Sequence, residues 1–123
     1  MKNKFKISII TVTKNSEKFL EENIKSLSNQ THKNFEHIIV DGGSTDNTIE
    51  IIKKNSDKIY KWISEPDDGL YYAMNKGIKL STGHIIGILN SDDIYHPNAL
   101  EIVNRYFSMD DNLDFLFGTV QKH

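Results

Sequence analysis

The residues best suited to chemistry are Asn90-Ser91-Asp92-Asp93, which directly follow the apolar residues 85–89. Two adjacent carboxylates repel one another and gain nothing from packing, so a ligand between them would explain their presence. Mg²⁺ and Mn²⁺ prefer oxygen ligands, and Mg²⁺ is commonly held by one or two carboxylates plus substrate phosphates. We therefore predict a divalent-metal site with Asp92 and Asp93 as ligands. The alternative is that one of the two caps the following loop or helix.

The pattern of apolar runs predicts the elements that must position this segment. Runs rich in β-branched residues indicate strands, and apolar residues at helical spacing indicate helices between them. Strands are expected at residues 6–13, 35–40, 58–64, 84–89 and 114–120, and helices at 17–30, 46–55, 70–80 and 97–107. This alternation predicts an α/β fold with a mostly parallel sheet and flanking helices, formed by one domain over residues 1–123. The third strand is the least apolar and is expected near an edge of the sheet.

Other polar residues also follow predicted strands. In an open parallel sheet, ligands bind beyond the carboxyl ends of the strands, where these residues would meet. Acidic residues at three strand ends would repel one another unless a cation or a donor-rich ligand lay among them. The set comprises Thr11, Thr13 and Asn15 from the first strand, Asp41 from the second, and Glu65, Asp67 and Asp68 from the third.

Asp41-Gly42-Gly43-Ser44-Thr45-Asp46 could be mistaken for a phosphate-binding loop. It lacks the G-x-G-x-x-G spacing of a dinucleotide site and the lysine of a P-loop. Asp41 would also repel a phosphate, so it is better suited to accept N–H groups of a base or hydroxyls of a ribose. A turn followed by a helix cap at Ser44 or Asp46 is the alternative.

Composition excludes several classes of protein. The chain has 123 residues, a net charge of −2 and no cysteine, so disulfides and thiolate metal sites are excluded. A weakly acidic chain with scattered lysines gives no reason to expect nucleic-acid binding. No segment approaches the length of about 18 apolar residues that a membrane span needs. A cytoplasmic domain is expected, without a transmembrane segment.

The order and spacing of these motifs resemble the family-2 glycosyltransferases of the GT-A fold. The resemblance runs through SIITVTKNSEKFLEENIKSLSNQTHKNFEHIIVDGGSTDNT and SEPDDGLYYAMNKGIKLSTGHIIGILNSDD, which together cover most of the chain. It is strongest to the bacterial branch that assembles surface polysaccharides. It implies a Rossmann-like nucleotide-binding half, a nucleotide-sugar donor such as a UDP-sugar, a Mn²⁺ or Mg²⁺ cofactor, and a saccharide or lipid-linked acceptor, with peripheral placement at the inner face of a membrane.

The resemblance also implies roles for individual residues. Asp41 matches the carboxylate that receives the base, and Asp92 would face the ribose or sugar while Asp93 faces the ion that bridges the diphosphate. The remaining implied donor-site positions are Thr11, Thr13, Asn15, Asp68, Asn75 and Lys76. From the surrounding sequence alone, Lys76 is expected to be a solvated lysine, so its role in the donor site rests on the resemblance.

The sequence departs from the family pattern at two points. Tyr72 stands where this branch commonly has Asp. Inverting members place their general base after the D-x-D-type motif, so the base is expected beyond His123, in an acceptor half that this chain lacks. A missing half would leave apolar surface uncovered, which favours a homodimer. The other functions that the residues allow are a Mg²⁺-dependent phosphotransferase or phosphohydrolase and a non-catalytic nucleotide-binding module.

Overall fold

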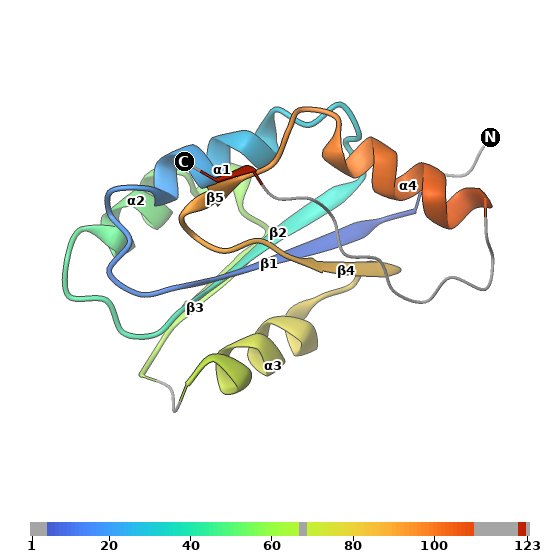
Figure 1. Cartoon of the computed structure of the whole chain (residues 1–123). Helices are drawn as coiled ribbons and strands as arrows, with labels where there is room; N and C mark the ends of the chain where they lie inside the picture. The colour runs from blue at the N-terminus through green and yellow to red at the C-terminus, as the bar shows by residue number, and fades with distance from the viewer. Residues whose placement is uncertain (1–4, 67–68, 110–120, 123) are drawn as a thin grey trace.

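The computed structural model describes residues 5–66, 69–109 and 121–122. A four-stranded parallel sheet with the order β3-β2-β1-β4 forms its centre (Figure 1). The elements are β1 (Ile7–Thr13), α1 (Leu20–Ser28), β2 (Phe35–Asp41), α2 (Thr48–Lys54), β3 (Lys61–Ser64), α3 (Leu70–Leu80), β4 (Ile85–Ile88), β5 (Asp93–Ile94), α4 (Ala99–Met109) and β6 (Gln121–Lys122). The predicted α/β class with a mostly parallel sheet is confirmed, and β3 lies at an edge of this sheet as expected.

Alternating residues of the strands build a core on both faces of the sheet. Ile9 points to the face covered by α1, α2 and α4, whereas Ile10 packs with Ala73 under α3 (Figure 1). Strands buried on both faces read as nearly continuous apolar runs, which explains why β1 and β2 were easy to locate in the sequence.

Several predicted boundaries differ from the structure. Residues Ser56–Lys58 form a 3₁₀ turn, so β3 is shorter than predicted. The first helix begins at Leu20 and the last at Ala99, later than their expected starts at Glu17 and Pro97. The short antiparallel pair of β5 and β6 was not predicted, because two-residue strands carry no periodic signal. The strand expected at residues 114–120 lies outside the described residues.

Gly77 lets α3 approach the sheet closely. A Cβ atom at this position would lie 2.5 Å from Ile10 Cγ2. Gly77→Ala is therefore expected to destabilise the protein by about 1–2 kcal/mol, because overpacking outweighs the better helix propensity of alanine. Urea denaturation would measure the change, with Lys79→Ala on the exposed side of α3 as the control. An unchanged or raised stability would contradict the close packing.

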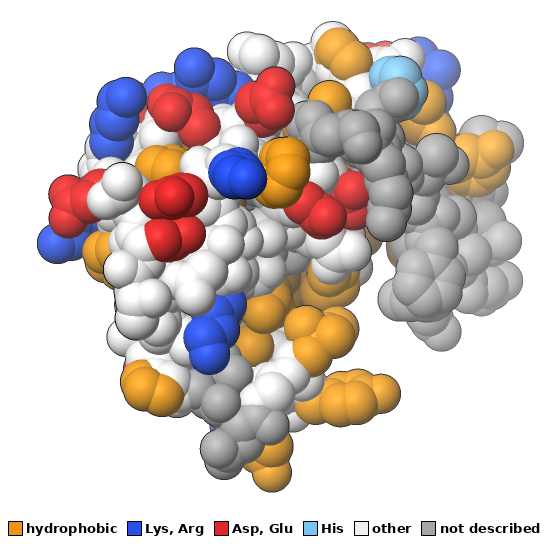
Figure 2. Space-filling model, turned by 60° about the vertical axis from the view of Figure 1, so that its left-hand side comes forward, with side chains coloured by type: hydrophobic (Ala, Val, Ile, Leu, Met, Phe, Trp, Pro, Cys, Tyr) orange, Lys and Arg blue, Asp and Glu red, His pale blue; other side chains and the backbone are white. Residues whose placement is uncertain are grey.

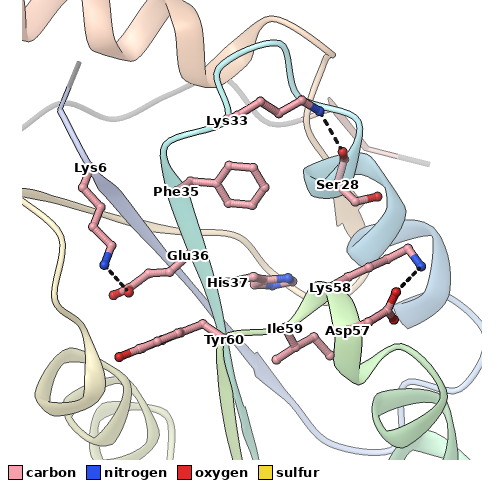
Figure 3. A pocket seen from close by; sticks show the side chains of 10 residues that line it. All are labelled: Lys6, Ser28, Lys33, Phe35, Glu36, His37, Asp57, Lys58, Ile59 and Tyr60. Carbon is pink, nitrogen blue, oxygen red and sulfur yellow. Dashed lines mark hydrogen bonds and ion pairs between the residues drawn. The ribbon is translucent and has the colours of Figure 1, made fainter. Parts of the chain in front are cut away.

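An open hollow of about 470 Å³ lies at the amino ends of the strands, opposite the predicted site (Figure 3). Its charged side chains pair among themselves: Lys6 Nζ lies 3.1 Å from Glu36 Oε1, and Lys58 pairs with Asp57. Burial alone would raise the pKa of Glu36, but hydrogen bonds from Ser8, Thr82 and Lys6 outweigh it and lower this pKa to about 2. This end of the sheet is therefore held together by a buried, ionised carboxylate.

His37 of β2 lines this hollow, on the face of the sheet that α1, α2 and α4 cover. Its Nε2 is 2.8 Å from Thr11 Oγ1, while its Nδ1 has no hydrogen-bond partner. Burial lowers the pKa of His37 from 6.5 to about 3, so the folded protein keeps this ring neutral. The unfolded chain takes up the proton near pH 6.5, so this contribution to stability is complete above that pH and falls as the pH drops toward 3.

The protein is therefore expected to lose about 2 kcal/mol of stability between pH 7 and pH 5 through His37 alone. Glu36 affects stability only at lower pH, because its lowered pKa confines its loss of stabilisation to the range from about pH 4.5 to 2. Urea denaturation at the two pH values should show a much smaller loss in His37→Gln and an unchanged loss in the exposed control His84→Gln. Equal pH dependence in the parent and His37→Gln would contradict this account.

Candidate functional site

The sheet topology places the candidate site at the carboxyl ends of β1 and β4. The chain runs from β1 outward to β2 and β3 on one side, and β4 lies on the other side of β1. Such a reversal of strand order opens a crevice beyond the strand ends, which is where ligands bind in open α/β sheets. The loops that follow Thr13 and Leu89 border this crevice.

Asn15 joins the loop after β1 to the loop after β2. Its φ of 51° is left-handed, a conformation that Asn adopts more readily than most residues. Its side-chain Oδ1 accepts the N–H of Thr45 at 2.8 Å, and its own N–H donates to Ser44 Oγ at 2.7 Å. The predicted position of Asn15 at the rim is thus observed, and its side chain holds the neighbouring loop in place.

Asp41 is completely buried at the end of β2. Its Oδ2 accepts the N–H groups of Gly43 and Ser44 at 3.0 and 2.8 Å and the hydroxyl of Ser64 at 2.8 Å. Its Oδ1 accepts the hydroxyl of Ser44. Four donors occupy about as many positions as a carboxylate offers, so Asp41 organises the loops after β2 and β3 in this conformation.

Asn90 to Asp93 form a tight turn that presents the two carboxylates differently. The N–H of Asp93 donates to the carbonyl of Asn90 at 3.1 Å, and Ser91 Oγ lies 2.9 Å from Ser16 Oγ across the crevice. Asp92 is exposed, whereas Asp93 is only 1% exposed and its Oδ1 has no hydrogen-bond partner. A buried carboxylate oxygen without a donor is costly, and a bound cation would remove that cost.

The charge of Asp93 also affects the pKa of its neighbour Tyr95. Burial, and then the negative charge of Asp93, raise the pKa of the Tyr95 hydroxyl to about 12. The hydroxyl stays protonated and donates to the carbonyl of Ile88 at 3.2 Å.

The residues present fit a metal ion that draws most of its ligands from a substrate. Within the described part of the chain, no three His, Cys, Asp or Glu side chains are grouped so that they could hold a metal. The exposed Asp92 and the unpartnered oxygen of Asp93 offer one or two carboxylate ligands. That donor set suits Mg²⁺ or Mn²⁺ completed by phosphate and water.

The other predicted site residues differ in their exposure and in their partners. Thr11 is buried beneath the rim with its hydroxyl against His37, and Thr13 at the strand end has a buried hydroxyl without a partner. On α3, Asn75 is exposed, and Lys76 pairs with Glu65 at 2.7 Å rather than being merely solvated. Asp68 lies outside the described residues.

Sequence reasoning missed the residues that connect these loops. Ser44 and Ser64 bind Asp41, and Ser16 contacts the turn of Asp92. Asn23 of α1 donates to the same turn from within the core. Serine and asparagine are common in loops and helices, so only the clustering of Ser44 with Asp41 in one short motif could have signalled such a role.

Comparison with known proteins identifies the family of this chain. The model of the family described as "Glycosyl transferase family 2" matches residues 8–122, so the chain belongs to glycosyl transferase family 2. An uncharacterised glycosyltransferase of Rickettsia conorii is 40% identical over 98% of this chain and 20% of its own length. A hyaluronan synthase of Pasteurella multocida is 33% identical over 92% of this chain and 12% of its own length.

Solved structures show the same fold. S. aureus TarS matches with a TM-score of 0.77 and 29% identity over 85% of this chain and 20% of that chain. The complex of TarS residues 1–349 with UDP-GlcNAc matches with a TM-score of 0.77 and 28% identity over 85% of this chain and 31% of that one. A mannosyltransferase from Pyrobaculum calidifontis, solved with GDP-Man and Mn²⁺, has a TM-score of 0.77 at 21% identity over 89% of this chain and 34% of its own, which supports the fold alone.

The chain spans about a fifth of the length of the Rickettsia conorii relative. Within the described residues, no helix combines the length and the apolar character needed to cross a membrane. Hydrophobic side chains gather on the lower part of the surface, over α3 (Figure 2). The exposed large hydrophobic residues of α3 are Leu70, Tyr71, Tyr72 and Ile78.

Proposed function

We propose that this chain forms the donor-binding part of a metal-dependent glycosyltransferase that uses a nucleotide-diphosphate sugar, with a UDP-sugar as the preferred donor. The observation that carries the proposal is the pair of carboxylates at the strand-order reversal. Asp92 is open to a ligand, and Asp93 has a buried oxygen that lacks a partner. Membership of the family and the likeness to the UDP-GlcNAc complex of TarS support the choice of donor.

Each loop at the rim would contact a different part of the donor. Asp41 and Asn15 fix the loops after β1 and β2 that would border the base, with Thr11 and Thr13 beneath them. Asp68, Asn75 and Lys76 would face the donor from the third loop and α3. Asp92 would contact the ribose or sugar and share with Asp93 the role of metal ligand.

In the reaction, a hydroxyl oxygen of the acceptor would form a bond to the anomeric carbon of the sugar as the bond from that carbon to the diphosphate breaks. The diphosphate leaves with the bonding electrons, and the proton of the hydroxyl passes to a base, with inversion at the anomeric carbon. A bound Mn²⁺ or Mg²⁺ would act as a Lewis acid that stabilises charge on the departing diphosphate. Asp92 and Asp93 would hold that ion, because two carboxylates alone would repel the diphosphate.

The names of the relatives support a proposal for the acceptor and the biological setting. The Pasteurella multocida relatives are named as hyaluronan and chondroitin synthases, which favours a role in surface polysaccharide synthesis. The acceptor would be a saccharide, free or lipid-linked, and the enzyme would work in the cytoplasm near the inner face of the membrane. The apolar side chains over α3 also favour a homodimer, which sedimentation analysis would detect.

A crystal soaked with UDP and Mn²⁺ tests this function directly. We expect an anomalous manganese peak within about 2.2 Å of a carboxylate oxygen of Asp92 or Asp93, on the side of the crevice that holds the diphosphate. UDP bound elsewhere, or manganese bound without either carboxylate, would refute the assignment.

A further inference from the structure

We infer that Asn23 is a positioning residue, which fixes the turn of Asp92 and Asp93 from inside the core. This inference rests on the proposed function, because it assigns Asn23 a role in metal-dependent donor binding. Asn23 lies on α1 and is completely buried, far in sequence from the turn that it contacts. It was not among the residues expected to serve the site.

The contacts of Asn23 connect the two ends of the turn. Its Nδ2 donates to the carbonyl of Asn90 at 2.9 Å and to the carbonyl of Asp93 at 3.0 Å. The carbonyl of Asn90 also accepts the N–H of Asp93, which closes the turn. One amide group therefore uses both of its hydrogens on the first and last residues of the segment that carries both carboxylates.

Ser26 of α1 and Gln30, just beyond the end of α1, hold the chain after the turn. Ser26 Oγ accepts the N–H of Tyr95 at 3.3 Å. Gln30 Nε2 donates to the carbonyl of His96 at 2.7 Å, and Gln30 Oε1 accepts the N–H of Leu100 at 3.0 Å. Asn23, Ser26 and Gln30 recur at helical spacing and bind main-chain groups of residues 90–100, in addition to the pairing of β5 with β6. We call these three residues the α1 clamp.

The clamp explains why a polar row lies on the buried face of an otherwise amphipathic helix. The segment after β4 leaves the sheet, so its main-chain groups lose their strand partners and need others inside the protein. A metal site needs its ligands held to within about 0.5 Å, and exposed loops seldom achieve this without support. Within the clamp, Asn23 is the member that contacts the carboxylate turn itself.

Asn23→Leu tests the inference, because leucine has a similar size but donates no hydrogen bond. Calorimetry of UDP binding should show a loss of about 10- to 100-fold in affinity when Mn²⁺ is present, the effect usually seen when an outer-shell partner of a metal site is removed. UDP affinity in EDTA should change less than about twofold, because the loops around Asp41 are untouched. If Asn23 contributed only to stability, Asn23→Leu would change UDP affinity equally with Mn²⁺ and in EDTA.

Asn55→Leu is the matched control. Asn55 is also a buried asparagine, at the C-cap of α2, and its Nδ2 donates to the carbonyl of Ile51 at 2.9 Å, away from the turn. Asn55→Leu should leave UDP affinity unchanged both with Mn²⁺ and in EDTA. Equal Mn²⁺ dependence in Asn23→Leu and Asn55→Leu would overturn the inference.

Hydrogen exchange separates this inference from the proposed function. The Asp93 amide should exchange at least about tenfold faster in Asn23→Leu than in the parent or Asn55→Leu, whether or not UDP binds. A parent that binds no nucleotide would refute the proposed function, while the exchange rates would still show whether Asn23 holds the turn. Asn23→Ser, which keeps one donor, should give intermediate values. If both Asn23 variants failed to fold, Asn23 would be a core residue and the positioning role would be refuted.

Discussion

Asp93→Asn is expected to make the metal-free protein more stable and to abolish the effect of Mn²⁺ on nucleotide binding. The carboxylate is 1% exposed and one of its oxygens has no donor, so replacing its charge with a neutral amide removes a desolvation cost. We expect a gain of about 1–2 kcal/mol in the free energy of unfolding. A function-related residue that costs stability is characteristic of an active site.

Asp92→Asn is the matched comparison, because Asp92 is the exposed neighbour in the same turn. Its stability should change by less than about 0.5 kcal/mol, as for most exposed substitutions. Both variants should reduce the enhancement of UDP binding by Mn²⁺ at least as much as Asn23→Leu does, because they remove a metal ligand and not an outer-shell partner. Urea denaturation and calorimetry would measure the two effects. A variant that kept the Mn²⁺ dependence of the parent would remove that residue from the metal site.

Asp41→Ala is expected to weaken UDP binding at least about tenfold even in EDTA, and to destabilise the protein by about 2–4 kcal/mol. The carboxylate receives hydrogen bonds from Gly43, Ser44 and Ser64, and its removal leaves these donors without their acceptor. The loops after β2 and β3 would lose their common anchor. The stability loss would come from the loops, and the affinity loss from the base pocket that we propose they form.

Ser64→Ala separates the two effects, because it removes one donor and keeps the carboxylate. It should reduce stability by about 1 kcal/mol and change UDP affinity less than Asp41→Ala does. Calorimetry in EDTA and urea denaturation would compare the two variants. Asp41→Ala that bound UDP like the parent would show that Asp41 takes no part in the nucleotide site, directly or through its loops.

The sequence allowed the α/β class and the polar residues at the strand ends to be predicted because both depend on local patterns. Apolar runs such as residues 35–40 identify buried strands, and polar residues at their ends identify the rim. Exposure could not be predicted in the same way. Asp92 and Asp93 are adjacent and chemically equal in the sequence, but the turn places one at the surface and the other beneath it.

Long-range contacts account for the rest of what was missed. Asn23 lies 67 residues before Asn90, and no periodicity links the two positions. Thr11 lies in a strand, as predicted. Its hydroxyl nevertheless contacts His37, because β1 and β2 are neighbouring strands of the sheet. Helix starts were misplaced at residue 17, since the sequence offered several polar residues before Leu20 that could begin the helix.

The most direct test of the central claim is calorimetry of UDP binding to the unaltered chain, with Mn²⁺ in one titration and EDTA in the other. If Asp92 and Asp93 form a site that is completed by a cation and a diphosphate, Mn²⁺ should raise UDP affinity at least about tenfold, which corresponds to about 1.4 kcal/mol. Equal affinity in the two titrations, or no binding of UDP or any other common nucleoside diphosphate, would contradict the claim.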